Sequence, residues 1–360
     1  MHLAQFIRQS FIVLNMVLVS LLALPSCMPS ASTTVLQPAR FKLPEHIAKV
    51  AVVDRSKPSD GWLNVLEGVF TGESIGQDRT SRQKAVEGLS DVLQRTPRFK
   101  VINTGIEMSG SRAGVNLPAP LEWSEVERIC ADFGADALVT IESFDTDNNV
   151  STRREQEKRK DKNGKQYTVS RYYSRMRTNV RTGWRMYDPK THTILDETVT
   201  DDEASDDSSG DTERQAVSNL PAPVKVSRKI AYVCGQEYGM RIAPTYVQVE
   251  RQYYGKAKGY KEQMRRANRF AESHDWDKAV AEWQAIEMHA KGHRNPKAAG
   301  RAAYNIAVAA EMQGKVDVAI EWAKLAWQDY GNKKARDYIQ VLQQRQSEDE
   351  RAADQMNKKV

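Results

Sequence analysis

Short runs of apolar, largely β-branched residues alternate with segments of helical periodicity in the first half of the chain. Such runs predict buried strands, here at 47–53, 99–102 and 137–141. Between them, apolar residues at helical spacing predict two amphipathic helices, one from Ser81 to Pro97 and one from Ser124 to Phe133. The order β-α-β-α-β predicts an α/β or α+β domain in which helices pack on a mixed sheet.

The second of these helices carries a signature at each end. Ser124 and Glu127 form an S-x-x-E pattern, which predicts a capping box at the first turn. Gly134 suits the left-handed position just after the helix.

After residue 141 the pattern becomes antiparallel. The Asn-Gly pair at 163–164 predicts a hairpin turn between two long strands. The strands are expected at 145–157, 167–187 and 194–200, followed by a helix at 224–238 and a last strand at 246–254. Together with the first segments they predict one domain over 47–256.

The remainder, over 257–345, is helical in character and contains an internal repeat. Ala267, Ala271 and Ala279 recur, 40 residues later, as Ala307, Glu311 and Ala319. This pattern resembles the tetratricopeptide family, in which small residues line the helix crossing and a glycine such as Gly314 forms the turn. His274 stands at the corresponding turn of the first copy. The usual period is about 34 residues, so we expect a longer connection around 291–296. A capping helix is expected at 334–344, and a frayed polar tail over 346–360.

The amino terminus has the pattern of an export signal. Arg8 precedes an apolar run over 11–24, which is shorter than the roughly 20 residues that a membrane-spanning helix needs. The run ends in Leu24-Pro25-Ser26-Cys27, which resembles the bacterial lipobox. That resemblance implies a signal peptide over 1–26 and a diacylglyceryl group on Cys27. An uncleaved anchor or an ordinary secretory signal are the alternatives.

The segment that follows Cys27 is rich in Ser, Thr, Pro and Ala and lacks apolar periodicity. It predicts a flexible tether over 27–46. No acidic cluster follows the cysteine, so we expect a protein on the periplasmic side of a membrane, with the outer membrane favoured. The other cysteines, Cys130 and Cys234, could form a disulfide in an oxidising compartment, although buried free thiols are favoured.

Charge and motifs argue against several function classes. The 53 basic and 47 acidic residues are interleaved and give a net charge of +6, so no nucleic-acid-binding face is expected. No P-loop, G-x-G-x-x-G or H-E-x-x-H motif is present, and we expect neither an enzyme nor a cofactor. His289 and His293 have helical i,i+4 spacing, but a solvated helix end is favoured over a metal site.

Three further groups have both a structural and a binding interpretation. An acidic run is expected to be a solvated loop, with a specific calcium site as the alternative. It contains Asp201, Asp202, Glu203, Asp206, Asp207 and Asp211. The basic segment 153–165 is favoured as a charged hairpin tip that discourages edge pairing, with anionic lipid or an acidic partner as alternatives. Four tryptophans could anchor a partner, and at least two are expected to be buried. They are Trp276, Trp283, Trp322 and Trp327.

The domain over 47–256 resembles envelope lipoprotein domains related to the curli-secretion channel protein and the TolB amino-terminal domain. The resemblance rests on 50–53, 98–102, 134–139 and 185–191. It implies a non-catalytic, membrane-anchored periplasmic lipoprotein that binds envelope proteins or peptides through its helical repeats. The alternative is a subunit of an oligomeric secretion pore or envelope assembly, and an oligomer is compatible with either. No site residues carry over.

Overall fold

The computed structural model describes residues 28–58, 75–111 and 117–356. The chain forms two compact units, and each is described by itself. We call residues 36–246 with 349–356 the sheet unit, and residues 28–35 with 247–348 the helical unit. Cys27 and the predicted signal peptide lie outside the described residues. No helix within the described ranges combines the length and apolar character needed to cross a membrane.

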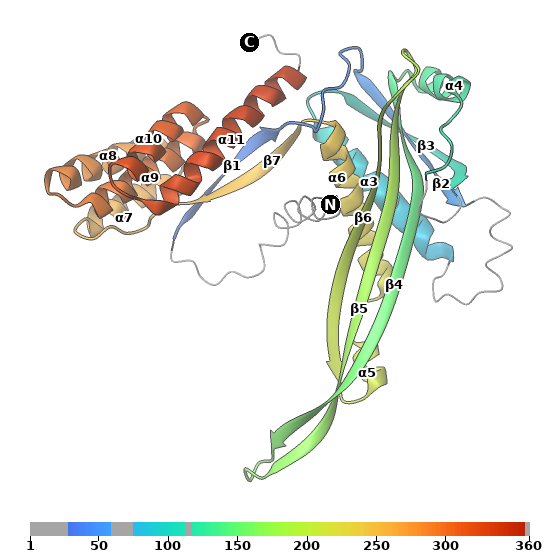
Figure 1. Cartoon of the computed structure of the whole chain (residues 1–360), viewed down its shortest axis with the longest axis horizontal. Helices are drawn as coiled ribbons and strands as arrows, with labels where there is room; N and C mark the ends of the chain where they lie inside the picture. Colours follow the sequence, from blue (N-terminus) through green and yellow to red (C-terminus); the bar gives the residue numbers. More distant parts are fainter. Residues whose placement is uncertain (1–27, 59–74, 112–116, 357–360) are drawn as a thin grey trace, which may run out of the picture. The chain divides into compact units, whose positions relative to one another are not determined.

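The sheet unit contains a five-stranded mixed sheet with the order β3-β2-β4-β5-β6 (Figure 1). β2 pairs in parallel with β3 and β4, whereas β5 pairs antiparallel with β4 and β6. The strands are β2 (Lys49–Pro58), β3 (Lys100–Ser111), β4 (Ala137–Lys160), β5 (Gln166–Asp188) and β6 (Thr193–Gly210). The predicted mixed sheet with helices packed on it is confirmed.

Helices cover both faces of the parallel part of this sheet. Val52 and Val139 share a core with α3 (Ile75–Arg95) and α6 (Pro223–Ile242), whereas Ala51 and Leu138 share one with α4 (Trp123–Phe133). α3 and α6 cross closely. A Cβ at Gly235 would lie 1.9 Å from the carbonyl oxygen of Ala85, so the two backbones touch there.

The ends of α4 match the sequence prediction only in part. Gly134 is left-handed, with a φ of 59°, as predicted. The prediction of a capping box is wrong, because the N-cap of α4 is Glu122, two residues before Ser124, and it makes no side-chain cap hydrogen bond. Ser124 therefore lies inside the helix. Glu127 instead pairs with His192, whose Nε2 lies 2.6 Å from Oε1 of Glu127.

Two strand predictions need correction. The expected strands at 137–141 and 145–157 are a single strand, β4, interrupted at Glu142 by a β-bulge between Ile141 and Ser143. The expected acidic loop over 201–211 is the second half of β6, up to Gly210. Its acidic residues are compatible with a strand because arginines of β5 lie opposite them.

The predicted flexible tether is also wrong in part. β1 (Ser30–Gln37) is a strand that pairs with β7 (Thr245–Gln252) in a separate two-stranded sheet. Only Ala31 and Val35 of β1 are buried, which is too sparse a pattern to read as a strand from sequence. β7 is therefore not a strand of the large sheet.

The helical unit consists of successive helices that share one hydrophobic core. They are α7 (Lys261–Glu272), α8 (Trp276–Gly292), α9 (Pro296–Met312), α10 (Val316–Gln328) and α11 (Lys333–Gln355). Each connection contains a left-handed residue, namely His274, Arg294, Gly314 and Gly331.

The connections and the tail differ from the sequence prediction. The extra residues of the 40-residue period lengthen α8 and α9, which have 17 residues each, and the connection over 293–295 is short. The predicted frayed tail is helical as far as Gln355, at the end of α11. Within the sheet unit, the side-chain amide of Gln355 bonds both backbone groups of Ala39, at 2.7 Å and 3.0 Å.

Candidate functional site

The most distinctive surface of the sheet unit is a long antiparallel arm. Strands in globular proteins usually have 3–10 residues, whereas β4, β5 and β6 have 24, 23 and 18. We call residues 143–182 and 200–210 the arm. Alternate β5 residues such as Met176 and Val180 are buried on the side of α6, and the intervening residues are exposed on the opposite side.

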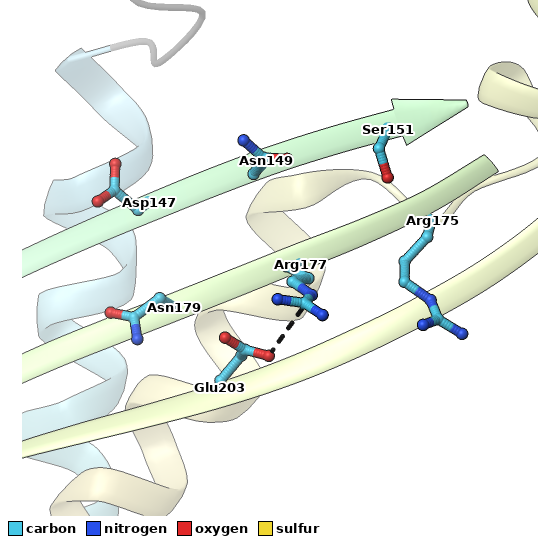
Figure 2. Close-up of a pocket in the computed structure, with 7 residues that line it drawn as sticks. All are labelled: Asp147, Asn149, Ser151, Arg175, Arg177, Asn179 and Glu203. Atoms are coloured by element: carbon cyan, nitrogen blue, oxygen red, sulfur yellow. Dashed lines mark ion pairs between the residues drawn. The ribbon is translucent and has the colours of Figure 1, made fainter. Parts of the chain in front are cut away.

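The exposed side of the arm carries a continuous polar face (Figure 2). We call this set the polar face: Asp147, Asn149 and Ser151 from β4, Arg175, Arg177 and Asn179 from β5, and Glu203 from β6. The register places Asp147, Asn179 and Glu203 in one row across the three strands. Side chains from three strands thus surround a shallow, open hollow.

Charges on and beside this face are largely compensated across the strands. Arg175 binds Asp207 through two hydrogen bonds of 2.8 Å and 3.0 Å. Arg181 approaches Asp201 at 2.6 Å. Arg177 lies 4.0 Å from Glu203, and the two side chains are 60% and 50% exposed, respectively. The hydrogen bond from Arg175 lowers the pKa of Asp207, so this carboxylate stays ionised and accepts hydrogen bonds.

The chemistry of the polar face suits recognition. Carboxylates, amides, a hydroxyl and guanidinium groups offer both hydrogen-bond donors and acceptors at alternate strand positions. Exposed ion pairs such as that of Arg177 contribute little to the stability of the fold. These side chains can therefore leave their present partners and bind the polar groups of another molecule at little cost.

Among the described residues, no strand pairs with the outer edge of β4 along the arm. β2 pairs with β4 only as far as Ile141, so in the described part of the chain β4 pairs with β5 alone from Ser143 onward. An open edge offers unpaired backbone groups to another strand. Charges at 153–160 and the bulge at Glu142 are features that limit such pairing.

A buried polar network fixes the base of the arm. Glu142 is fully buried and accepts hydrogen bonds from Arg55 at 2.7 Å, Tyr187 at 2.6 Å and Thr140 at 2.7 Å. Arg185 lies 3.8 Å from the same carboxylate. Burial and the hydrogen bond to Glu142 raise the pKa of Tyr187 to about 12. Tyr187 belongs to the core on the α4 side of the sheet, so Glu142 lies on that side.

A second titratable cluster lies where α6 meets β6. The thiol of Cys234 donates a hydrogen bond to Asp202 at 3.0 Å. Burial, with a smaller contribution from Asp202, raises the pKa of Glu237 to about 7. Burial also raises the pKa of Asp202.

The structure separates the two predicted thiols. Cys130 lies in the core on the α4 side of the sheet, and Cys234 lies in the core on the α3 and α6 side. Both are free and buried, which confirms the favoured interpretation. Burial raises the pKa of Cys130 to about 11, so its thiol is protonated and unreactive near neutrality.

The remaining predicted groups are structural or exposed. The rings of His289 and His293 stack 4.0 Å apart, and within the residues described here no third ligand joins them. Of the four tryptophans, only Trp283 is buried, and the other three pack partly exposed against the helical core. The expectation of at least two buried tryptophans is therefore wrong.

Sequence reasoning did not select the polar face. The alternation of Arg175, Arg177, Asn179 and Arg181 with apolar or small residues has period 2 and would have indicated one exposed polar side. The partners of these residues could not be identified, because the cross-strand register depends on a bulge that the sequence does not mark.

The fold and the site define an α+β domain with an extended polar arm, followed by a helical region. The chain belongs to the family described as Domain of unknown function (DUF8603), which matches residues 47–254. A second family, Domain of unknown function (DUF6340), matches residues 265–344. No curated protein matches the chain.

Two solved structures are similar to parts of the chain. A PelC dodecamer from Paraburkholderia phytofirmans is 9% identical, with 59% of this chain and 99% of that chain covered and a TM-score of 0.23. A putative neuraminyllactose-binding hemagglutinin homolog from Helicobacter pylori is 12% identical, with 57% and 87% covered and a TM-score of 0.25. Similarity at this level supports no inference about function.

Proposed function

We propose that this protein is a non-catalytic, membrane-anchored periplasmic lipoprotein that binds envelope proteins as an adaptor or scaffold. The observation that carries the binding role is the arm: its strands extend far beyond the length that a sheet core requires, and one side stays exposed and polar. Residues 158–168 at the end of the arm are exposed throughout, so little burial offsets the conformational entropy lost when they are ordered, which favours a role in contacting another molecule.

The anchoring part of the proposal rests on the amino-terminal sequence. The run over 11–24 and the Leu24-Pro25-Ser26-Cys27 sequence support lipidation of Cys27. Acyl chains contribute about 0.8 kcal/mol per buried methylene, so a multiply acylated cysteine would hold the folded units at a membrane. Mass spectrometry of the mature amino terminus tests this part directly. An unmodified thiol or an intact leader would refute it.

We further propose that the helical unit is tetratricopeptide-like and offers a second surface for proteins or peptides. Support comes from the buried small residues Ala307, Ala319 and Ala326 and from the left-handed turn residues His274 and Gly314, which occupy equivalent positions in the two copies.

A charge reversal on the polar face tests the binding role. Arg177→Glu places a third acidic group beside Asp147 and Glu203, yet it removes only an exposed pair and should leave the fold intact. A matched control is Arg128→Glu on α4, which also replaces an exposed, acid-paired arginine.

After crosslinking in cells, the wild-type chain and the Arg128→Glu variant should retain the same discrete set of envelope proteins. The Arg177→Glu variant should lose members of that set. Identical sets from all three chains would contradict a binding role for the polar face.

The second candidate function is a subunit of an oligomeric assembly. The open edge of β4 from Ser143 onward is the observation that favours it, because another copy could add a strand there. The mass of the detergent-extracted protein separates the two functions. A ring of defined stoichiometry supports the assembly, and a monomer supports the adaptor.

A further inference from the structure

The arm ends in a two-stranded ribbon, which no third strand accompanies among the described residues. β6 ends at Gly210, opposite Tyr172, whereas pairing between β4 and β5 continues to Lys160 and Gln166 (Figure 1). We call residues 154–172 the tip ribbon. It extends about 20 Å beyond the end of β6, given about 3.3 Å per residue. Residues 158–168 are exposed throughout.

The two faces of the tip ribbon carry different side chains. One face presents Arg154, Lys158 and Lys160 of β4 in register with uncharged residues of β5. Those uncharged residues are Gln166, Thr168, Ser170 and Tyr172. We call the three cations on this face the basic strip. The other face presents Glu155, Glu157 and Arg159 of β4, with Arg153 just before the ribbon.

The charges on the two faces are balanced differently. On the second face Arg153 lies 3.1 Å from Glu155, and Arg159 lies 3.1 Å from Glu157. The basic strip has no such pairing. Arg154 bonds only the hydroxyl of Ser170, and in the described residues no acidic group lies within ion-pair distance of Lys158 or Lys160.

The turn extends the uncompensated charge. Lys162 and Lys165 at the hairpin end also have no ion-pair partner among the residues that the structure covers. The one acidic residue there, Asp161, accepts hydrogen bonds from the backbone of Asn163 and Lys165, at 2.9 Å and 2.8 Å, and shapes the turn. Prevention of edge pairing alone does not require unpaired cations on one face of the ribbon and ion pairs on the other.

The composition of the basic strip distinguishes between occupants. Protein interfaces depend on buried aromatic or apolar anchors, and lysine is depleted in them. The strip contains two lysines and an arginine, and its register partners are mostly small or amide side chains. Flexible ammonium groups spaced along a ribbon suit a surface of laterally mobile phosphates.

We propose that the basic strip binds the phosphate groups of anionic lipids at a bilayer surface. This inference rests on the proposed attachment of the chain to a membrane, which would hold the arm near lipid. Each cation near an anionic surface contributes about a factor of five in affinity, so the strip alone would give reversible, salt-sensitive contact.

The test uses the mature chain, purified from membranes and reconstituted through its own anchor into nanodiscs of phosphatidylcholine. Capture of these nanodiscs is measured on immobilised vesicles of phosphatidylcholine, with and without phosphatidylglycerol. Two variants, Lys158→Gln/Lys160→Gln and Arg153→Gln/Arg159→Gln, remove the same net charge from opposite faces of the ribbon.

The wild type should bind only the vesicles that contain phosphatidylglycerol, and 1 M salt should abolish binding. The Lys158→Gln/Lys160→Gln variant should bind about thirtyfold more weakly, and the matched variant should change less than threefold. Inorganic phosphate at constant ionic strength should not compete, because a single phosphate does not reproduce the array. Competition by phosphate would instead identify a discrete anion site.

Other results overturn the inference in distinguishable ways. Equal weakening by both variants would show that net charge is responsible. Equal binding to both vesicle types, or no binding to either, would refute the binding of anionic lipid. The basic strip would then serve to bind an acidic protein or to prevent edge pairing. Failure of the chain to enter nanodiscs would refute the proposed anchor and would do so before any vesicle is added.

Discussion

Replacing Glu142 tests whether the buried network supports the arm. Glu142→Gln keeps the side-chain shape but removes the counter-charge of Arg55 and the buried partner of Arg185, whose side chains are 12% and 5% exposed. Breaking a buried pair by removing one charge costs about 3–5 kcal/mol. A domain is usually stable by about 5–15 kcal/mol, so the sheet unit should survive with much reduced stability.

Hydrogen exchange measured by mass spectrometry is the suitable assay, because two units make a single unfolding midpoint ambiguous. Protection of peptides from the paired parts of β4 and β5 should fall by about two to four orders of magnitude. Peptides from α8 to α10 should exchange as in the wild type. They serve as an internal control.

The matched control is Glu197→Gln. Glu197 pairs with the same Arg185 at 2.5 Å, but its side chain is 47% exposed. Without Glu197, Arg185 still has Glu142 as a buried partner at 3.8 Å, and water can replace the half-exposed carboxylate of Glu197, so exchange in β4 and β5 should change by less than about tenfold. If both variants have the same effect, or if Glu142→Gln has none, burial of Glu142 does not stabilise the arm.

Three further predictions each concern a single residue. Gly235→Ala should unfold the sheet unit or lower its free energy of unfolding by more than about 3 kcal/mol, because the new Cβ would lie 1.9 Å from the carbonyl oxygen of Ala85. Thermal unfolding close to that of the wild type would refute this prediction. Glu237 has its pKa raised to about 7, so from about pH 4.5 to 7 the folded chain holds a proton that the unfolded chain has lost. The free energy of unfolding of the wild type should then fall as pH rises, by up to about 3 kcal/mol relative to that of a Glu237→Gln variant. If the difference in free energy of unfolding between the two chains stays constant from about pH 4.5 to 7, the prediction is wrong. Asn305 bonds both backbone groups of Tyr254, at 2.7 Å and 2.9 Å, so Asn305→Ala should destabilise the helical unit by about 2–3 kcal/mol in denaturant unfolding, whereas a loss below 0.5 kcal/mol would show that water replaces the side chain.

The parts of the fold that local pattern predicts are those with a strong hydrophobic period. β2, α3 and α6 follow from runs or stripes of buried residues, and the Asn-Gly turn follows from backbone preference, with Gly164 at a φ of 79°. His274 adopts the left-handed conformation expected at its turn although it is not glycine.

The parts that failed depend on distant partners. β1 has little apolar pattern of its own and forms because β7 pairs with it. The acidic residues of β6 favour a loop by composition, yet Arg175 and Arg181 of β5 compensate their charge. The polar face was missed for the same reason, since its rows exist only in the cross-strand register.

The most direct test of the binding role is photocrosslinking in intact cells from single positions on the arm. A photoreactive amino acid in place of Asn149, on the polar face, should give a discrete heavier product. The same group in place of Asp132, an exposed residue of α4, should not give that product. Absence of any product from Asn149, or the same product from both positions, would contradict the proposal that the arm contacts a partner.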